Sequence, residues 1–232
     1  MRIEGARRAL VLFDIDGTLL SRSGPHHRQA LVDAVRAITG LETTTENIPL
    51  QGMLDRDILR EMLANAGAAE REIRAWMPQL VKRAQWLYSR NCPDDLRDRV
   101  CPGVVDLLGT LQRRRAGRAL VTGNLSQIGW KKMERARLRH FFHFGAFAEF
   151  GRTRGELVRN AIAEARRRGH HDRNVPVTLI GDHANDIQAA RENRIRVVSV
   201  ATGVMPVQEL ATFQPDLLVP NLTTLDVEFL FE

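Results

Sequence analysis

The sequence has few cysteines and no long hydrophobic run. Its 232 residues include two cysteines, Cys92 and Cys101, which cannot form a disulfide framework and lack the spacing of a metal site. No apolar run approaches the roughly 20 residues that a membrane helix needs, because the first candidate, residues 9–13, is stopped by Asp14 and Asp16. That run is also too short for a signal peptide, and no small-residue cleavage site follows it. We therefore expect a soluble, cytoplasmic protein without a membrane partner.

Lysine is also scarce, whereas arginine is abundant. Of the 34 basic residues three are lysines, Lys82, Lys131 and Lys132, and the formal net charge is +6. A basic balance can attract nucleic acid or anionic small molecules. The arginines are spread along the chain, however, and the clusters 113–115 and 166–168 lie at the ends of helical patterns, where cations complement the helix dipole. Because no zinc-finger spacing or RNA-binding aromatic signature accompanies them, we do not expect a nucleic-acid partner.

Short apolar runs alternate with stretches of helical spacing. We expect buried strands at residues 9–13, 118–122, 146–150, 177–180 and 196–200, and core helices at 104–111, 128–138, 156–168 and 186–193. Strands and helices that alternate at this interval predict an α/β fold, a Rossmann-like doubly wound parallel sheet with helices on both faces. We expect the run 217–219 and the tail 222–231 to complete the sheet and cover one face.

A long segment after the first strand contains no convincing strand. It shows helical spacing at residues 27–39, 55–66 and 70–88, with apolar residues on one side of each helix. We therefore predict an all-helical domain, residues 21–99, inserted into a core formed by residues 1–20 and 100–232.

Acidic side chains follow two of the predicted strands. Asp14 and Asp16 come directly after the first strand, and Asp182 and Asp186 follow a later one. Ligands of open parallel sheets bind outside the carboxyl ends of the strands. Helix capping alone could account for one of these pairs, but not for acids that converge from two strands. Such a cluster would repel strongly unless a cation or a positive ligand were present, and carboxylates suit Mg²⁺.

Groups that can hold an anion follow two other strands. Thr122, Gly123 and Asn124 end the second core strand and supply a hydroxyl and backbone N–H groups near a helix start, which is a natural anion site. Arg154 follows the third core strand, where its guanidinium could hold phosphate.

These motifs together resemble the haloacid dehalogenase superfamily, whose four motifs occur here in order. They are DIDGT at 14–18, the threonine of VTGN at 122, a basic residue before a helix at 154, and GDHAND at 181–186. The insertion is similar to the helical cap of the phosphoglycolate phosphatase and beta-phosphoglucomutase branch. A lone DxDGT is already specific, and four ordered motifs at strand ends form a strong signal.

The resemblance implies phosphoryl transfer through an aspartyl-phosphate. Asp14 would be the nucleophile, and Asp16 would be the general acid for the leaving group and then the general base for water. Dehalogenase members expel halide and need no acid at this position, so Asp16 favours phosphate esters. The implied Mg²⁺ would be held by Asp14, the backbone carbonyl of Asp16 and Asp182, with Asp186 supporting the metal shell.

The remaining implied groups hold the phosphoryl oxygens: Thr122, the amides of Gly123 and Asn124, and Arg154. The family usually has lysine at the last of these positions, whereas this chain offers Arg154, which has the better spacing, or Arg152. Arginine keeps the positive charge and can bind phosphate through two hydrogen bonds. We interpret His183 as a bystander.

The substrate itself is not defined by these motifs. We expect a small phosphorylated metabolite, phosphoglycolate-like or a sugar phosphate, and Arg56 in the cap could bind a substrate anion. His26 and His27 could face the cleft, but the sequence favours a surface position at a helix start for both. The alternatives are a phosphomutase of the beta-phosphoglucomutase type and a non-catalytic binding protein. A monomer and a homodimer are both compatible with the sequence.

Overall fold

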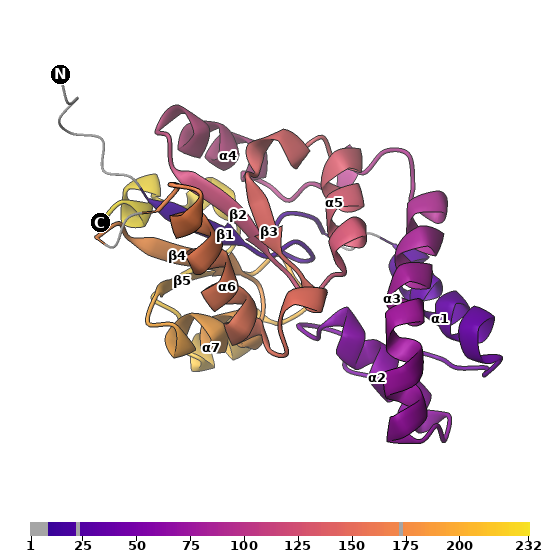
Figure 1. The fold of residues 1–232 in the computed structure, drawn as a ribbon. Helices are drawn as coiled ribbons and strands as arrows, with labels where there is room; N and C mark the ends of the chain where they lie inside the picture. Colours follow the sequence, from indigo (N-terminus) through magenta and orange to yellow (C-terminus); the bar gives the residue numbers. More distant parts are fainter. Residues whose placement is uncertain (1–8, 22–23, 172–173) are drawn as a thin grey trace.

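A computed structural model describes residues 9–21, 24–171 and 174–232 of the chain. Residues 1–8, 22–23 and 172–173, which belong to the expected core and inserted ranges, lie outside the described residues. Six strands form one parallel sheet in the order β3-β2-β1-β4-β5-β6 (Figure 1). Their bounds are β1 Leu10–Phe13, β2 Gly117–Val121, β3 Phe144–Ala146, β4 Val177–Gly181, β5 Arg196–Val200 and β6 Leu217–Val219. The predicted doubly wound α/β fold is confirmed.

Strand β1 lies in the middle of the sheet. All four of its residues, LVLF, are buried, as expected of a strand that is covered on both faces. Leu10 is in register with Gly117 of β2 on one side and with Val177 of β4 on the other. The carboxyl ends of β1, β2 and β4 are therefore neighbours at one edge of the sheet.

Helices cover both faces of the sheet. Helices α6 and α7 pack on one face, and α4 lies on the opposite side (Figure 1). This arrangement follows from right-handed crossovers between parallel strands, since the order of the strands reverses at β1. The core helices are α4 Val104–Arg113, α5 Ser126–Arg135, α6 Arg154–Arg167, α7 Ala184–Glu192 and α8 Val207–Thr212.

One predicted strand is placed wrongly. Instead of residues 146–150, strand β3 covers Phe144–Ala146, and Ala148–Phe150 forms the 3-10 helix η3. The ladder with β2 ends where Thr122 N donates to Ala146 O (3.1 Å), and Ala148 N then donates to Asn124 O (3.0 Å), which turns the chain. The Phe150 side chain is exposed (57%), so the aromatic run does not continue as a buried strand. The predicted tail forms two further 3-10 helices, η4 Leu222–Thr224 and η5 Val227–Leu230.

Among the described residues, three α-helices lie between β1 and α4 in the sequence, followed by the 3-10 helix η1 Arg97–Arg99. The three are α1 His26–Thr39, α2 Asp55–Asn65 and α3 Glu70–Asn91. They lie together to one side of the sheet (Figure 1), and α1 packs along α3 through an apolar face that includes Leu31 and Val35. The chain leaves and re-enters the core at a bridge between Leu20 and Val100. Two backbone groups also hold the helices to the core, because Asp55 N donates to Gly123 O (2.8 Å) and Gly52 O accepts from Asn185 Nδ2 (2.9 Å).

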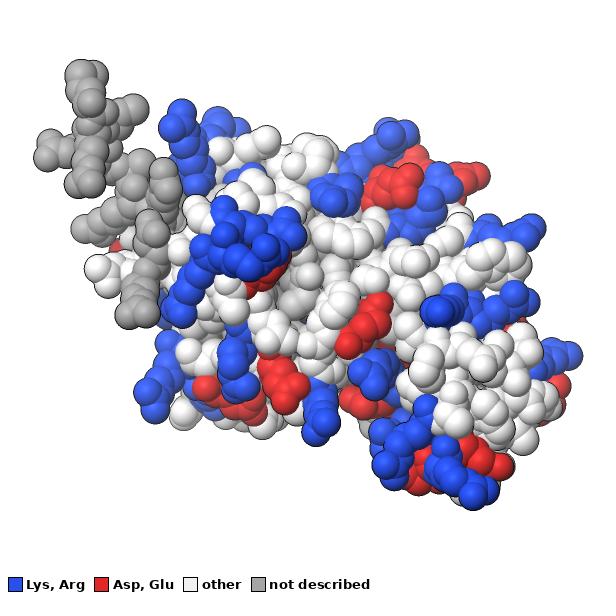
Figure 2. All heavy atoms as spheres, in the orientation of Figure 1, with Lys and Arg blue, Asp and Glu red and all other residues white. Residues whose placement is uncertain are grey.

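The surface carries charges of both signs. On the face shown in Figure 2, basic side chains are spread over the sheet-containing part and the inserted helices, with acidic side chains among them. The even distribution agrees with the interpretation of arginine as a general surface cation. Within the described residues no helix has the length and hydropathy of a membrane span.

Candidate active site

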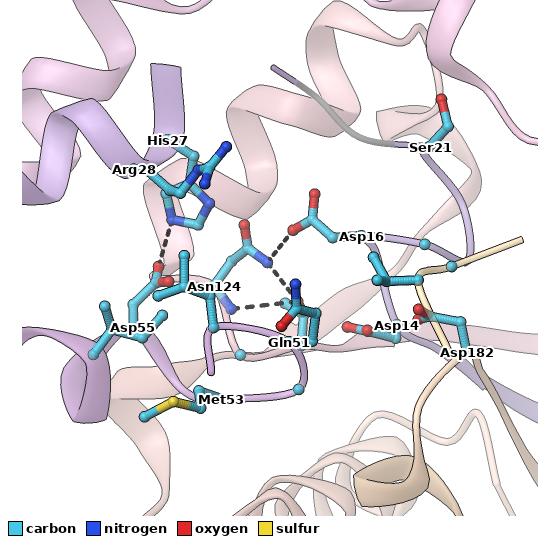
Figure 3. Close-up of a pocket in the computed structure, with 18 of the residues that line it drawn as sticks. Asp14, Asp16, Ser21, His27, Arg28, Gln51, Met53, Asp55, Asn124 and Asp182 are labelled. Carbon is cyan, nitrogen blue, oxygen red and sulfur yellow. Dashed lines mark hydrogen bonds and ion pairs between the residues drawn. The ribbon is translucent and has the colours of Figure 1, made fainter. Parts of the chain in front are cut away.

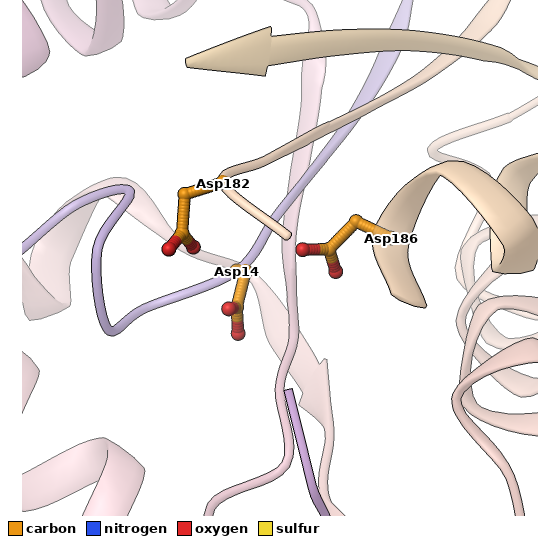
Figure 4. Close-up of side chains that lie close together, drawn as sticks. All are labelled: Asp14, Asp182 and Asp186. Atoms are coloured by element: carbon orange, nitrogen blue, oxygen red, sulfur yellow. The ribbon is translucent and has the colours of Figure 1, made fainter. Parts of the chain in front are cut away.

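Three buried carboxylates meet at the carboxyl ends of β1 and β4 (Figure 4). Asp14 follows β1, Asp182 follows β4, and Asp186 lies in the first turn of α7. One oxygen of each carboxylate lies within 4.8 Å of the others. The backbone allows this convergence at Gly17, because a Cβ at that position would lie 2.1 Å from Asp182 Oδ2, and Gly17 also has a positive φ of 87°. The glycine of the DIDGT motif, Gly17, therefore leaves room for the carboxylate of Asp182.

Arg154 is the cation of this cluster. Its Nη1 atom lies 3.1 Å from Asp14 Oδ1 and 3.0 Å from Asp186 Oδ1. Thr153 caps α6 by accepting a hydrogen bond from Glu156 N (3.1 Å), so Arg154 is the first helical residue and points back at the strand ends. Arg152 precedes Thr153 and lies outside the helix. Its side chain is exposed, and its backbone N donates to Glu156 Oε2 (2.7 Å). Of the two predicted arginines, Arg154 is thus the one that the fold brings to the acids.

Burial and mutual repulsion perturb the acids. Burial, together with the Asp14 and Asp186 carboxylates, raises the pKa of Asp182 to about 8 against the hydrogen bond from Thr18 Oγ1 (3.1 Å). Burial also raises the pKa of Asp186, although Arg154 opposes the shift. Burial lowers the pKa of Arg154, but attraction to Asp14 and Asp186 outweighs it and the net shift is upward. Arg154 therefore stays charged and compensates part of the acidic cluster.

The donor set fits a hard divalent cation. Three carboxylates and one guanidinium carry a net charge of −2 if all are ionised (three negative charges and one positive). Asp186 Oδ1 has no hydrogen-bond donor among the described residues, although it lies near Arg154. Carboxylate oxygens are the ligands that Mg²⁺ prefers. The residues present therefore suit the predicted Mg²⁺, which would be held by Asp14 and Asp182 with Asp186 beside them.

The predicted anion-binding segment, Thr122–Asn124, lines the cavity beside the acids. Thr122 is buried, and its Oγ1 accepts from Asn124 Nδ2 (2.8 Å). Gly123 touches the inserted domain, since a Cβ there would lie 2.2 Å from Met53 O. All three residues line the same cavity as Asp14 and Arg154. The structure thus brings together the predicted hydroxyl, amide and guanidinium groups.

Asp16 lies at the same cavity but points toward the inserted helices (Figure 3). Its Oδ2 accepts a hydrogen bond from Asn124 Nδ2 (2.8 Å). Lys132 Nζ donates to both carboxylate oxygens, at 2.8 Å to Oδ1 and 2.6 Å to Oδ2. Burial alone would raise the pKa of Asp16, but the electrostatic effects of Lys132 and His27 and the hydrogen bonds from Lys132 and Asn124 lower it to about 2.

Lys132 is the functional residue that the sequence reasoning missed. It is fully buried and lies on the inner face of α5 with Ile128, Gly129 and Met133. A lysine in the apolar stripe of an amphipathic helix was the available signal, since such positions normally hold apolar side chains.

The cavity between the two parts has a volume of about 950 Å³. The inserted helices contribute His27, Arg28 and Asp55 to its wall (Figure 3). Arg56, the predicted ligand for a substrate anion, lies on α2 but is not among the residues that line the cavity, and neither is His26. His183 does not line it either. Its Nδ1 accepts from Asn185 N (3.2 Å) at the start of α7, which agrees with a structural role.

Fold and site together define an α/β architecture whose carboxyl sheet edge carries an acidic centre that suits a cation and a segment that suits an anion. The chain belongs to the haloacid dehalogenase-like hydrolase family, whose model matches residues 9–193. The predicted family membership is confirmed, and the protein is a hydrolase of this family.

Solved structures with the same fold cover nearly the whole chain. Beta-phosphoglucomutase from Clostridium difficile has a TM-score of 0.68 and 18% identity, over 96% of this chain and 95% of that chain. A predicted phosphoglycolate phosphatase from Haemophilus somnus has a TM-score of 0.65 and 20% identity, over 93% and 95%. CbbY from Rhodobacter sphaeroides, in complex with phosphate, has a TM-score of 0.68 and 18% identity, over 94% and 96%. No curated protein is similar enough in sequence to match.

Proposed function

We propose that the protein is a Mg²⁺-dependent phosphatase that hydrolyses a small phosphate monoester through an aspartyl-phosphate. One observation carries the proposal: Asp14 contacts groups of both kinds. It belongs to the carboxylate cluster with Asp182 and Asp186, which suits a cation, and it also contacts Arg154, which suits an anion. An anionic nucleophile can approach an anionic phosphate only where positive charge screens their repulsion. When bound, Mg²⁺ supplies this screening as a Lewis acid.

In the first proposed step, a carboxylate oxygen of Asp14 attacks phosphorus. The bond between this oxygen and phosphorus forms while the ester P–O bond breaks. The leaving oxygen takes a proton from Asp16, which takes up that proton when the anionic substrate binds beside it and raises its pKa. Thr122, the Gly123 and Asn124 amides and Arg154 hold the phosphoryl oxygens. In the second step Asp16 removes a proton from water, the water oxygen attacks phosphorus, and the Asp14–phosphorus bond breaks. Inorganic phosphate and free Asp14 result.

The inserted helices supply the second part of the proposal. We propose that residues 21–99 act as a cap on the core formed by residues 1–20 and 100–232, and that the cap selects the substrate. A cavity of about 950 Å³ leaves room for an organic group beside the phosphate. Its cap wall combines Leu31, Met53 and Ile58 with the cation Arg28. This lining supports a small phosphorylated metabolite, such as a sugar phosphate or a phosphoglycolate-like ester.

The test is phosphate release from a panel of small phosphate esters, with Mg²⁺ or with chelator. We expect metal-dependent release by the wild type and none above background by Asp14→Asn, because an amide cannot attack phosphorus. Asp106→Asn is the matched control, since Asp106 is exposed on α4. Activity retained in Asp14→Asn would refute the assignment of the nucleophile.

A phosphomutase is the second candidate, because the chain shares its fold with a beta-phosphoglucomutase over nearly its full length. The same panel separates the two activities. Isomerisation of a sugar phosphate that depends on a bisphosphate activator, with little release of inorganic phosphate, would identify a mutase. Absence of both activities would favour a non-catalytic binding role.

A further inference from the structure

A buried polar network joins the proposed acid–base residue Asp16 to the cap. Its centre is Lys132, which contacts both oxygens of Asp16 and donates to Asn124 Oδ1 (2.7 Å). The fourth contact is with His27 Nδ1 of helix α1, at 3.2 Å (Figure 3 shows His27, Asn124 and Asp16). Lys132 is therefore held by one carboxylate, one amide and one imidazole.

The protonation of His27 follows from these contacts. An ammonium group only donates hydrogen bonds, so His27 Nδ1 accepts from Lys132 and Nε2 carries the ring proton. Nε2 then donates to Asp55 Oδ2 (3.0 Å). The ring is further fixed by Tyr88, whose ring lies edge-on at a centroid distance of 5.7 Å. The two ring nitrogens of His27 therefore each have one partner: Nδ1 contacts Lys132 in the core, and Nε2 contacts Asp55 in the inserted helices.

Asp55 returns the network to the core. The same Oδ2 atom accepts from Leu125 N (2.8 Å), directly after the anion-binding segment. The backbone N of Asp55 donates to Gly123 O (2.8 Å). The path therefore runs from Asp16 through Lys132 to His27 and Asp55 in the cap, and back to Gly123 and Leu125 in the core.

Burying an ammonium group is costly unless it is fully hydrogen-bonded. An apolar side chain at position 132 would fill the same place on α5 without this cost, so the charge is not required to pack the helix. Its contacts instead fix the two oxygens of Asp16, whose side chain lines the cavity with 37% of its surface exposed.

We propose that Lys132 is a positioning residue that aligns the Asp16 carboxyl group with the substrate, and that His27 makes this alignment depend on the cap being seated on the core. The inference rests on the proposed phosphatase function, because it assigns Lys132 and His27 to the proton-transfer half of that reaction. Lys132 acts through Asp16 and does not touch the phosphoryl group.

The test compares esters that differ in their need for a general acid. An alkyl phosphate expels a poor leaving group and depends on protonation, whereas 4-nitrophenyl phosphate expels a stable phenolate. For Lys132→Met we expect kcat on the alkyl ester to fall by about 100-fold or more, the usual size of a general acid–base contribution. Loss of alignment outweighs the higher pKa that Asp16 gains when the charge of Lys132 is removed. The single-turnover release of 4-nitrophenol, which reports the attack of Asp14 alone, should fall by less than about 10-fold.

Lys131→Met is the matched control, because Lys131 is the neighbouring lysine on α5 and pairs with Glu134 (3.0 Å) outside the cavity. It should retain wild-type rates on both esters. If Lys132→Met does not fold, as judged by thermal unfolding, His27→Gln provides the second variant, since it leaves Lys132 in place and removes its cap partner. It should show the same selective loss on the alkyl ester, of about 10-fold.

Equal losses on both esters in Lys132→Met or, if that variant does not fold, in His27→Gln would overturn this inference while leaving the phosphatase assignment intact. An unaffected His27→Gln would overturn the coupling to the cap. A wild-type protein that releases phosphate from no ester would overturn the proposed function and this inference together.

Discussion

The acidic cluster makes a sharp prediction for the substitution Asp182→Asn. Asp14 and Asp186 each contact Arg154, at 3.1 and 3.0 Å, whereas the hydrogen-bond partner of Asp182 is the neutral hydroxyl of Thr18. Two like charges 4.8 Å apart, the limit of the oxygen separations here, repel by ~3.5 kcal/mol at an effective dielectric constant of about 20. Removing the charge of Asp182 should therefore stabilise the metal-free protein, while Asn retains an oxygen for Thr18.

The pH dependence has a defined sign. The pKa of Asp182 is raised from 3.8 to about 8 in the folded chain, so the folded chain keeps a proton that the unfolded chain releases. The stability contributed by this protonation is complete below pH 3.8 and is lost as the pH rises to about 8. Between pH 5 and 8 the advantage of Asp182→Asn should grow by up to ~4 kcal/mol, three pH units at ~1.4 kcal/mol each.

Thermal unfolding in the presence of chelator measures this effect. For a chain of this length, ~4 kcal/mol corresponds to a difference in Tm of about 10 °C. Asp106→Asn controls for the loss of an exposed carboxylate and should show no such trend. Added Mg²⁺ should raise the Tm of the wild type at pH 8 and that of Asp182→Asn much less. A Tm difference that is the same at pH 5 and pH 8 would refute the argument from charge repulsion.

Two further substitutions test the anion side and the cap contact. Arg154→Met should lower kcat by about 100-fold or more, because it removes the charge beside Asp14, whereas Arg152→Met should stay near wild type in a steady-state phosphatase assay. Comparable losses in both variants would contradict the assignment of Arg154. Gly123→Ala would place a methyl group 2.2 Å from the backbone oxygen of Met53, so we expect kcat/KM to fall by about 10- to 100-fold through misplacement of the cap, together with a lower Tm because the backbone must shift. Wild-type kcat/KM would show that the cap does not need this contact.

Much of the fold and of the acidic cluster could be predicted because the signals are local. Asp14 and Asp182 follow short apolar runs, and parallel strands place their carboxyl ends at one edge. The strand at residues 146–150 was predicted wrongly, because its aromatic residues look like a buried strand while a tertiary contact, the hydrogen bond from Ala148 N to Asn124 O, turns the chain. Nothing within the run itself indicates that bond.

A local pattern in the sequence distinguishes Arg154 from Arg152. Thr153 followed three residues later by Glu156 is a typical start of a helix, and it makes Arg154 the first helical residue. The role of Lys132 depends instead on long-range contacts. Asp16 lies 116 residues away in sequence and His27 lies 105 residues away. Spacing along the chain cannot reveal these pairings, because they arise only when segments that are distant in sequence pack together.

Because β1 lies at the centre of the sheet, a change in the residues at its carboxyl end has other consequences than a change in the inserted helices. Its hydrogen-bonded neighbours β2 and β4 fix the spacing of Asp14, the segment Thr122–Asn124 and Asp182 at the separation of adjacent strands, about 4.8 Å. The inserted helices are not part of this ladder. In the sequence they lie between Leu20 and Val100, which form a bridge at the edge of the core. Under the proposed function, exchange of cap side chains would alter which ester is accepted while the residues that break the phosphorus–oxygen bond keep their spacing.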